Sequence, residues 1–222
     1  MPDSSSYISV QGQGTINVIP DVMRLEIEIS DLFDSYDDAY SRGKENKRWV
    51  SRILESNKLS PSLGTTVDFD LQETKKRLAD VQGSDRSEEE NIAYSLHQKI
   101  RIDIPIDGTL ASHIVREIGE KIPGVCISIG YTLRDLQQIQ LKILEKAVSD
   151  AGIKAKVMAE AAGCSLGRVA KINYKLEKTS VYRHARTIHT NNEAKSSTPG
   201  GLDITPADFV ISDTVEVTWN LK

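Results

Sequence analysis

The feature that most constrains the fold of this chain is a long run of residues at helical spacing, from Asp135 to Gly167. Apolar side chains recur every three or four positions, at Leu136, Ile139, Ile143, Ala147, Ala151, Ala155, Met158 and Ala162. Gly163 follows, and a glycine there can take the left-handed conformation that ends a helix. We therefore expect a helix about 40 Å long, whose alanine-lined second half packs closely on a sheet.

Length and charge exclude several classes of protein. The chain has 222 residues, enough for a sizeable core, and a net charge of −4 gives no reason to expect nucleic acid or an anionic membrane as partner. No apolar run approaches the roughly 18 residues of a transmembrane segment. The start, MPDSSSYISV, has no signal-peptide pattern. We expect a cytoplasmic protein as the sequence is written, or one of the cell envelope or periplasm if a leader was removed.

Alternating apolar and polar residues predict the strands. They occupy residues 7–19, 23–29, 65–71, 92–106, 125–133, 167–176 and 214–221. Helical spacing predicts two further helices, at residues 34–57 and 107–121. Because each strand alternates instead of reading as a solid apolar run, we expect an α+β fold, with a mostly antiparallel sheet and helices packed on one face.

The order of these elements indicates a single domain over residues 1–222, built from two strand-helix-strand modules at roughly 7–78 and 92–222. Two polar stretches, about 79–91 and 178–203, are typical of flexible loops. The polar side of the strands should face water or another subunit, and it carries Arg24, Glu26, Glu28, His97, Arg101 and Glu216.

The glycine pair in YISVQGQGTINVI has two interpretations. Gly12, Gln13 and Gly14 could belong to a phosphate-binding loop, but no third glycine, lysine or helix start follows. A kink or bulge in a strand at Gly12–Gly14 is the favoured interpretation.

The ionisable residues form no recognisable catalytic or metal motif. His184 and His189, near Arg183 and Arg186, suit polar loop positions better than a metal or anion site. Asp68 and Asp70 share a strand face but lack a paired nucleophile or base. His97, between Lys99 and Arg101 on the polar side of a strand, is expected to be a surface or interface histidine. The serines near the N-terminus lack the setting of a hydrolase nucleophile.

The two cysteines, Cys126 and Cys164, exclude a disulfide framework. Cys126 points away from the apolar face of its strand and is expected to be an inert thiol. We therefore predict no catalytic, cofactor-binding or metal-binding residues and no cofactor.

Three stretches of the chain resemble the SIMPL-domain family of bacteria. They are the opening ISVQGQGTINVIPDVMRLEIEIS, the helix and turn KAVSDAGIKAKVMAEAAGCSLGRVAKI, and the closing ITPADFVISDTVEVTWNLK. The resemblance spans nearly the whole chain and implies an α+β domain that forms homo-oligomers, with a link to oxidative-stress defence and no established catalytic residues. Gly152 and Ile153 depart from the basic residue and alanine usual at this point of the helix.

Together these observations favour a non-enzymatic, self-associating binding or scaffold protein, with a homo-oligomer and a protein partner as expected assemblies. The alternative is a small-molecule carrier or an enzyme with a pocket between the sheet and the 178–203 loop.

Overall fold

The structure of the chain is a computed structural model that describes residues 6–76, 91–175, 181–189 and 206–222. These residues form three α-helices, one short 3-10 helix and eight strands. The strands are arranged in two antiparallel sheets. The elements are β1 Tyr7–Val18, β2 Val22–Phe33, α1 Tyr36–Ser56, the 3-10 helix Pro61–Leu63, β3 Gly64–Lys76, β4 Asn91–Ile104, α2 Gly108–Lys121, β5 Cys126–Thr132, α3 Leu136–Ala161, β6 Leu166–Asn173, β7 Tyr182–His189 and β8 Phe209–Leu221. The α+β class and the antiparallel pairing are confirmed, although the strands form two sheets where one was expected.

The chain divides into two compact units, and neither is continuous in sequence. Unit 1 combines Met1–Pro20, Leu133–Tyr182 and Pro206–Lys222, and unit 2 combines Asp21–Thr132 and Arg183–Thr205. Unit 1 therefore holds β1, α3, β6 and β8, and unit 2 holds the remaining strands with α1 and α2. The expectation of a single domain stays a prediction, because compactness of each part does not test whether the parts fold independently.

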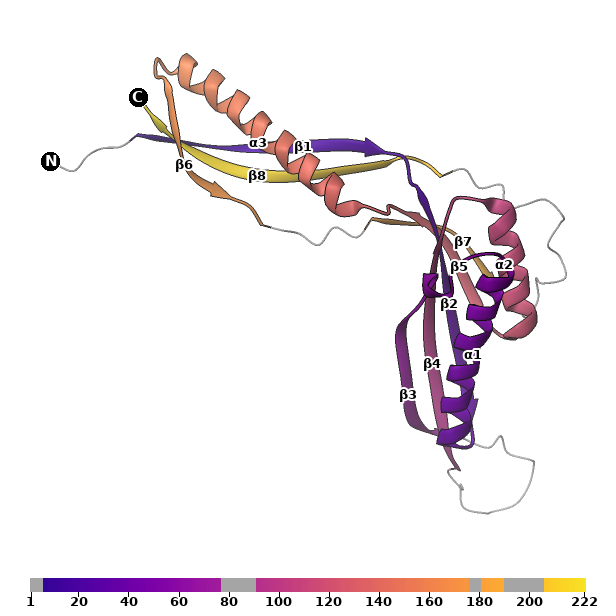
Figure 1. The fold of residues 1–222 in the computed structure, drawn as a ribbon. Helices are drawn as coiled ribbons and strands as arrows, with labels where there is room; N and C mark the ends of the chain where they lie inside the picture. Colours follow the sequence, from indigo (N-terminus) through magenta and orange to yellow (C-terminus); the bar gives the residue numbers. More distant parts are fainter. Residues whose placement is uncertain (1–5, 77–90, 176–180, 190–205) are drawn as a thin grey trace, which may run out of the picture. The chain divides into compact units, whose positions relative to one another are not determined.

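Unit 1 is a three-stranded sheet in the order β1-β8-β6 (Figure 1). Strands β1 and β8 pair without interruption from Tyr7 opposite Asn220 to Val18 opposite Phe209. The bulge predicted at Gly12–Gly14 is therefore wrong, and the glycines lie in regular strand. Register shifts occur instead in β6, between Leu166 and Lys171.

Helix α3 packs on β1 and β8 over one face of this sheet. Asp135 caps it by accepting a hydrogen bond from the backbone N–H of Gln138, and Gly163 follows its end with a φ of 74°. The predicted helix is confirmed, but its buried face differs at the C-terminal end, where Met158 and Ala162 are exposed. The buried stripe advances four residues at a time, through Ile143, Ala147, Ala151, Ala155 and Ala159.

Three side chains of α3 bind the outer backbone edge of β1. The carboxylate of Asp150 accepts a hydrogen bond from the Gln13 N–H at 2.8 Å. One turn to either side, Lys146 donates to the Thr15 carbonyl at 3.3 Å and Lys154 to that of Gln11 at 3.5 Å. Helix side chains thus occupy the edge that another strand would otherwise use.

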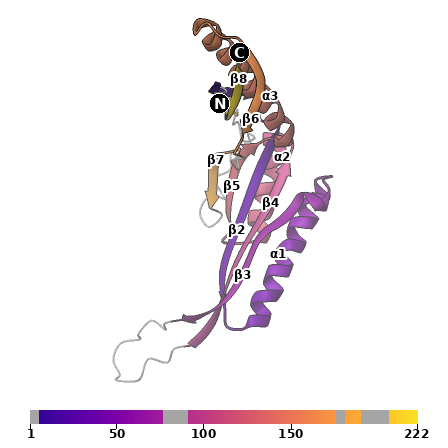
Figure 2. The same ribbon diagram turned by 90° about the vertical axis from the view of Figure 1, so that its left-hand side faces the viewer.

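Unit 2 is a five-stranded sheet in the order β3-β4-β2-β5-β7. Its first six elements, β2-α1-β3-β4-α2-β5, are the two strand-helix-strand modules that the sequence predicts in this region. Their strand order is that of the ferredoxin-like split βαβ arrangement. Figures 1 and 2 show α1 and α2 on the same side of the sheet, so among the described residues of unit 2 no helix covers its other face.

A buried polar pair lies between α1 and this sheet. The Gln98 side chain on β4 donates to the Gly43 carbonyl at 3.1 Å and accepts from the Asn46 amide at 3.2 Å. Both side chains are almost fully buried, and the Asn46 Oδ1 has no hydrogen-bond partner among the described residues. The remaining core of unit 2 is mostly aliphatic, and inward residues of β2, β4 and β5 share it with buried residues of α1 and α2.

Two sequence expectations about surface segments need correction. Residues 182–189 form strand β7 at the edge of the unit 2 sheet, so the prediction of a loop over the whole of 178–203 is wrong there. Residues 178–180 and 190–203 of that stretch, and residues 79–90 of the other, lie outside the described residues. Glu216 belongs to unit 1, and it therefore does not share a sheet with the other five residues of the predicted polar face.

Candidate functional site

The uncovered face of the unit 2 sheet carries a ladder of ion pairs between β2 and β4. Antiparallel register places Arg24 opposite Asp103 and Glu26 opposite Arg101. The Arg24 guanidinium donates two hydrogen bonds to the Asp103 carboxylate, at 2.7 and 2.8 Å. Such bidentate pairs are the strongest geometry for this charge combination. Most of the charge on this face is therefore satisfied within the sheet.

Lys99 forms the next step of the ladder. Its ammonium lies 2.9 Å from Glu28 and 3.1 Å from Glu26. The hydrogen bond to Glu28, with that to Glu26, raises the pKa of Lys99 against the opposing effect of burial. Lys99 is therefore a fixed cation at neutral pH and not a candidate base.

His97 meets a hydroxyl and a carboxylate on the same face. The Ser30 Oγ lies 3.1 Å from the His97 Nδ1, the Asp68 carboxylate lies 4.0 Å from its Nε2, and Asp70 is the residue opposite His97 in register. The three residue types match a hydrolase triad, but all stand on extended strands with the imidazole and carboxylate well exposed. Paired strands use backbone N–H groups in their ladders, so this setting does not favour an oxyanion hole, and the arrangement supports the predicted surface histidine.

Both cysteines are free, as expected, and both are half-buried. Cys126 lies on the polar face of β5, opposite Glu28. Burial, with the nearby Glu28 carboxylate, raises the pKa of the Cys126 thiol. A raised thiol pKa disfavours the reactive thiolate, in agreement with the predicted inert thiol.

The remaining sequence candidates are dispersed. His184 and His189 are exposed on β7, and five positions apart on a strand they point to opposite faces. Gly12 and Gly14 lie inside a strand, so they form no phosphate loop. In the part of the chain that the structure describes, no three histidine, cysteine or acidic side chains are grouped as a metal site would require. Over the same residues, no helix has the length and apolarity needed to cross a membrane.

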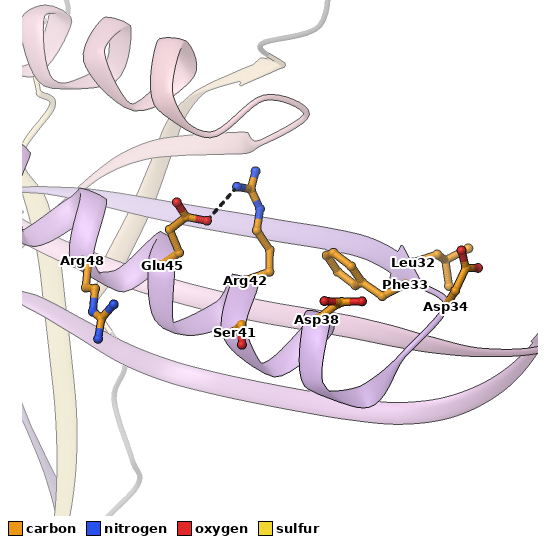
Figure 3. Close-up of a pocket in the computed structure, with 8 residues that line it drawn as sticks. All are labelled: Leu32, Phe33, Asp34, Asp38, Ser41, Arg42, Glu45 and Arg48. Carbon is orange, nitrogen blue, oxygen red and sulfur yellow. Dashed lines mark hydrogen bonds and ion pairs between the residues drawn. The ribbon is translucent and has the colours of Figure 1, made fainter.

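A pocket of about 670 Å³ lies beside the first half of α1 in unit 2 (Figure 3). One stripe of α1 and the last residues of β2 line it: Leu32, Phe33, Asp34, Asp38, Ser41, Arg42, Glu45 and Arg48. Arg42 forms an ion pair with Glu45 at 3.4 Å. Ser35 caps the helix, and its hydroxyl donates a hydrogen bond to the Asp38 carboxylate at 2.7 Å. The pocket is open and mostly polar, which suits a peptide or polar group better than an apolar cofactor.

A second pocket, of about 650 Å³, lies on the polar face of the unit 1 sheet. Glu216 accepts hydrogen bonds there from Asn173 and Ser9, which lower its pKa. The Tyr174 hydroxyl donates to Asp213 at 2.8 Å. These polar groups satisfy one another, so the pocket presents few groups that need a ligand.

Four aromatic rings gather on the side of α1 opposite the pocket that this helix lines. We call them the aromatic surface: Tyr36, Tyr40, Phe69 and Tyr94. Tyr36 stacks on Tyr40 with centroids 6.2 Å apart and meets Tyr94 edge-on at 6.0 Å. Tyr40 meets Phe69 edge-on at 6.4 Å. Although packed together, three of the rings stay exposed, Tyr36 by 52%, Tyr40 by 41% and Phe69 by 40%.

Gly43 makes this arrangement of rings possible. A Cβ at position 43 would come within 2.4 Å of the Phe69 ring, so only glycine lets that ring lie against α1. Helical spacing predicted the helix at residues 34–57 but did not indicate this surface. The available signal was the spacing of Tyr36, Tyr40 and Gly43, but it does not identify the strands that contribute the other rings.

The fold and these surfaces define an α+β protein of two antiparallel sheets, with an ion-paired sheet face, open pockets and an exposed aromatic cluster. The chain belongs to the SIMPL family, described as a protein of unknown function (DUF541), which it matches over residues 8–219. The match spans parts of both units and confirms the resemblance seen in the sequence. A comparison with curated proteins gives no match.

Proposed function

We propose that this chain is a non-enzymatic binding or scaffold protein that self-associates, and that it acts in stress response. The observation that carries self-association is the aromatic surface of unit 2, where exposed rings from α1 and β3 pack with one another and with the partly buried Tyr94 ring of β4. Tyrosine and phenylalanine are enriched at the centres of protein interfaces because they bury much area at little cost in side-chain entropy.

The rings are also held in place before any partner arrives. Each is in contact with at least one other ring, and the Lys44 ammonium lies 4.7 Å from the centre of the Tyr40 ring. Rings already ordered in this way lose less freedom on association than isolated exposed side chains. The stress-response part of the proposal rests on the family resemblance alone.

Light scattering on the purified chain tests self-association. We expect the wild type to have a mass that is a multiple of the chain mass across the micromolar range. The double variant Tyr36→Ser, Tyr40→Ser should shift to monomer, because truncating a ring at an interface centre typically costs about 2 kcal/mol.

The matched control is Tyr7→Ser, which removes a tyrosine that is 57% exposed in unit 1, outside the aromatic surface. It should keep the wild-type mass. A wild type that stays monomeric at high concentration, or a double variant that keeps the wild-type mass, would refute the proposal.

A further inference from the structure

Strand β2 has partner strands on both sides only along its first part. It pairs with β5 from Val22 to Glu28, whereas its pairing with β4 continues to Phe33. From Ile29 to Phe33, β4 is therefore the only strand paired with β2 among the described residues. The backbone N–H and C=O groups on the other side of this segment form an open sheet edge, the site at which added strands bind.

The open edge lies at the pocket beside α1. Leu32 and Phe33 line the pocket from β2, and Figure 3 shows Arg42 and Glu45 extending from α1 into the same space. The pocket could hold the side chains of a strand added next to β2, with the α1 stripe as its wall. This combination of an edge and a pocket for alternate side chains is what β-strand addition requires.

Asp31 determines the charge that this edge favours. Alternation along β2 places Asp31 on the same face as the buried Ile29 and the half-buried Phe33. It is itself half-buried, and no cation pairs with it among the described residues. Arg42, a cation of the pocket lining on α1, is already paired with Glu45. A carboxylate partly removed from water favours a cation brought by the occupant.

The same edge of a second copy does not satisfy this requirement. Opposite residues in an antiparallel pair point to the same face, so two copies of this edge related by a two-fold axis can only meet with Asp31 opposite Asp31, Ile29 or Phe33. The first choice places like charges together and the other two leave the carboxylate against an apolar side chain. The occupant is therefore a strand whose sequence differs from that of Ile29–Phe33.

We propose that the edge Ile29–Phe33 binds an extended peptide as an added strand, with a lysine or arginine opposite Asp31 and apolar side chains on either side of it on the same face. This inference rests on the binding role proposed above and gives that role a ligand class. It uses the side of α1 opposite the aromatic surface, so both surfaces can be occupied at once.

The probe is a fluorescently labelled synthetic peptide, Thr-Thr-Val-Thr-Arg-Thr-Val-Thr-Thr-amide, whose binding is followed by fluorescence anisotropy. Two matched peptides accompany it: one with glutamate in place of the arginine, and one with N-methyl groups on alternate backbone nitrogens. We expect saturable binding of the arginine peptide, at least about tenfold weaker binding of the glutamate peptide, and loss of binding on N-methylation.

The protein variant Asp31→Lys should reverse the preference, so that the glutamate peptide binds better. Glu55→Lys is the control, because Glu55 is exposed at the other end of α1, and it should keep the wild-type preference. Absence of saturable binding, equal binding of the two charged peptides, unchanged binding after N-methylation, or an arginine preference that survives Asp31→Lys would overturn the inference.

Light scattering on the same samples separates this inference from self-association. A monomeric wild type that binds the arginine peptide would refute self-association and support the inference. An oligomeric wild type that does not bind the arginine peptide would support self-association and refute the inference.

Discussion

Gly12 lies so close under α3 that a Cβ at this position would come within 2.0 Å of the Ala147 carbonyl oxygen. Gly14 has the same relationship to the Ile143 carbonyl, also at 2.0 Å. The helix backbone therefore rests almost directly on the strand backbone, and the alanine stripe of α3 completes the contact. The glycine pair is an adaptation to close packing and not to a bend in the strand.

Replacing Gly12 by alanine should destabilise unit 1 strongly. The added methyl group meets backbone atoms of α3, which cannot move aside as a flexible side chain would. We expect Gly12→Ala to lower the free energy of unfolding by about 3 kcal/mol or more. Urea unfolding followed by fluorescence measures this, with Trp219 of β8 as the reporter in a Trp49→Phe background.

Gly152→Ala is the matched control for that experiment. Gly152 lies within α3, and a Cβ there would have nothing within 4 Å. Because alanine favours a helix interior over glycine, this variant should be stabilised by up to about 1 kcal/mol. Equal effects of the two substitutions would contradict the close packing.

Asp150 should contribute stability that disappears in acid. The hydrogen bond from Lys154, with that from the Gln13 N–H, holds the pKa of Asp150 below its usual value of 3.8. A carboxylate whose pKa is lower in the folded state stabilises the fold above its unfolded pKa, and this contribution is lost as pH falls through the folded pKa.

Thermal unfolding of wild type and Asp150→Asn as a function of pH tests this. The wild type should have the higher melting temperature at pH 7, and the two curves should converge only in acid, below the usual carboxyl pKa of 3.8. Glu145→Gln, on the exposed side of the same helix, should show no such convergence. A constant difference between wild type and Asp150→Asn at all pH values would contradict the assigned role.

The buried pair in unit 2 should show coupling between its members. Gln98→Leu leaves the Asn46 amide and the Gly43 carbonyl without their buried partner, and we expect it to cost about 1–3 kcal/mol. Adding Asn46→Leu removes an amide that already has one unpaired oxygen, so the double variant should recover part of the loss. Urea unfolding, reported by Trp49 of α1, gives the free energies of unfolding of the wild type, the two single variants and the double variant. If the losses of the single variants simply add up in the double variant, the two side chains do not act as a pair.

Cys126 should react slowly with thiol reagents. Burial and the Glu28 carboxylate raise the pKa of its thiol, so little thiolate exists at neutral pH. In a Cys164→Ser variant, we expect the maleimide reaction at pH 7 to be slower than that of glutathione under the same conditions. A faster maleimide reaction in Glu28→Gln would show that the Glu28 carboxylate contributes to the raised pKa of the Cys126 thiol. A Cys126 reaction faster than that of glutathione would contradict the assignment of an inert thiol.

Periodicity predicted much of the fold because burial on one face of an element follows from local spacing. The helix that begins after Asp107, the end of α3 near Gly163 and the inward aliphatic residues of β2 all depend on neighbours within a few positions. Contacts between distant elements were not predictable in this way. Nothing in the local pattern at Gly12 indicates that a helix backbone from residue 147 lies above it.

The candidate surfaces show the same limit. Alternation placed His97 correctly on a polar strand face, but its proximity to Ser30 and Asp68 depends on register between three strands. The open edge of β2 arises because β5 ends its pairing at Glu28, which is a property of the whole sheet. The strand at 182–189 was missed because its sequence, YRHARTIH, lacks a clear alternation of apolar residues.

The central claim is that copies of this chain meet through the aromatic surface, and hydrogen exchange tests it most directly. Amide exchange measured by mass spectrometry at low and high protein concentration should show added protection at high concentration in peptides covering the start of α1 and the part of β3 around Phe69. Exchange in those peptides that does not depend on concentration, or added protection confined to other segments, would contradict the account.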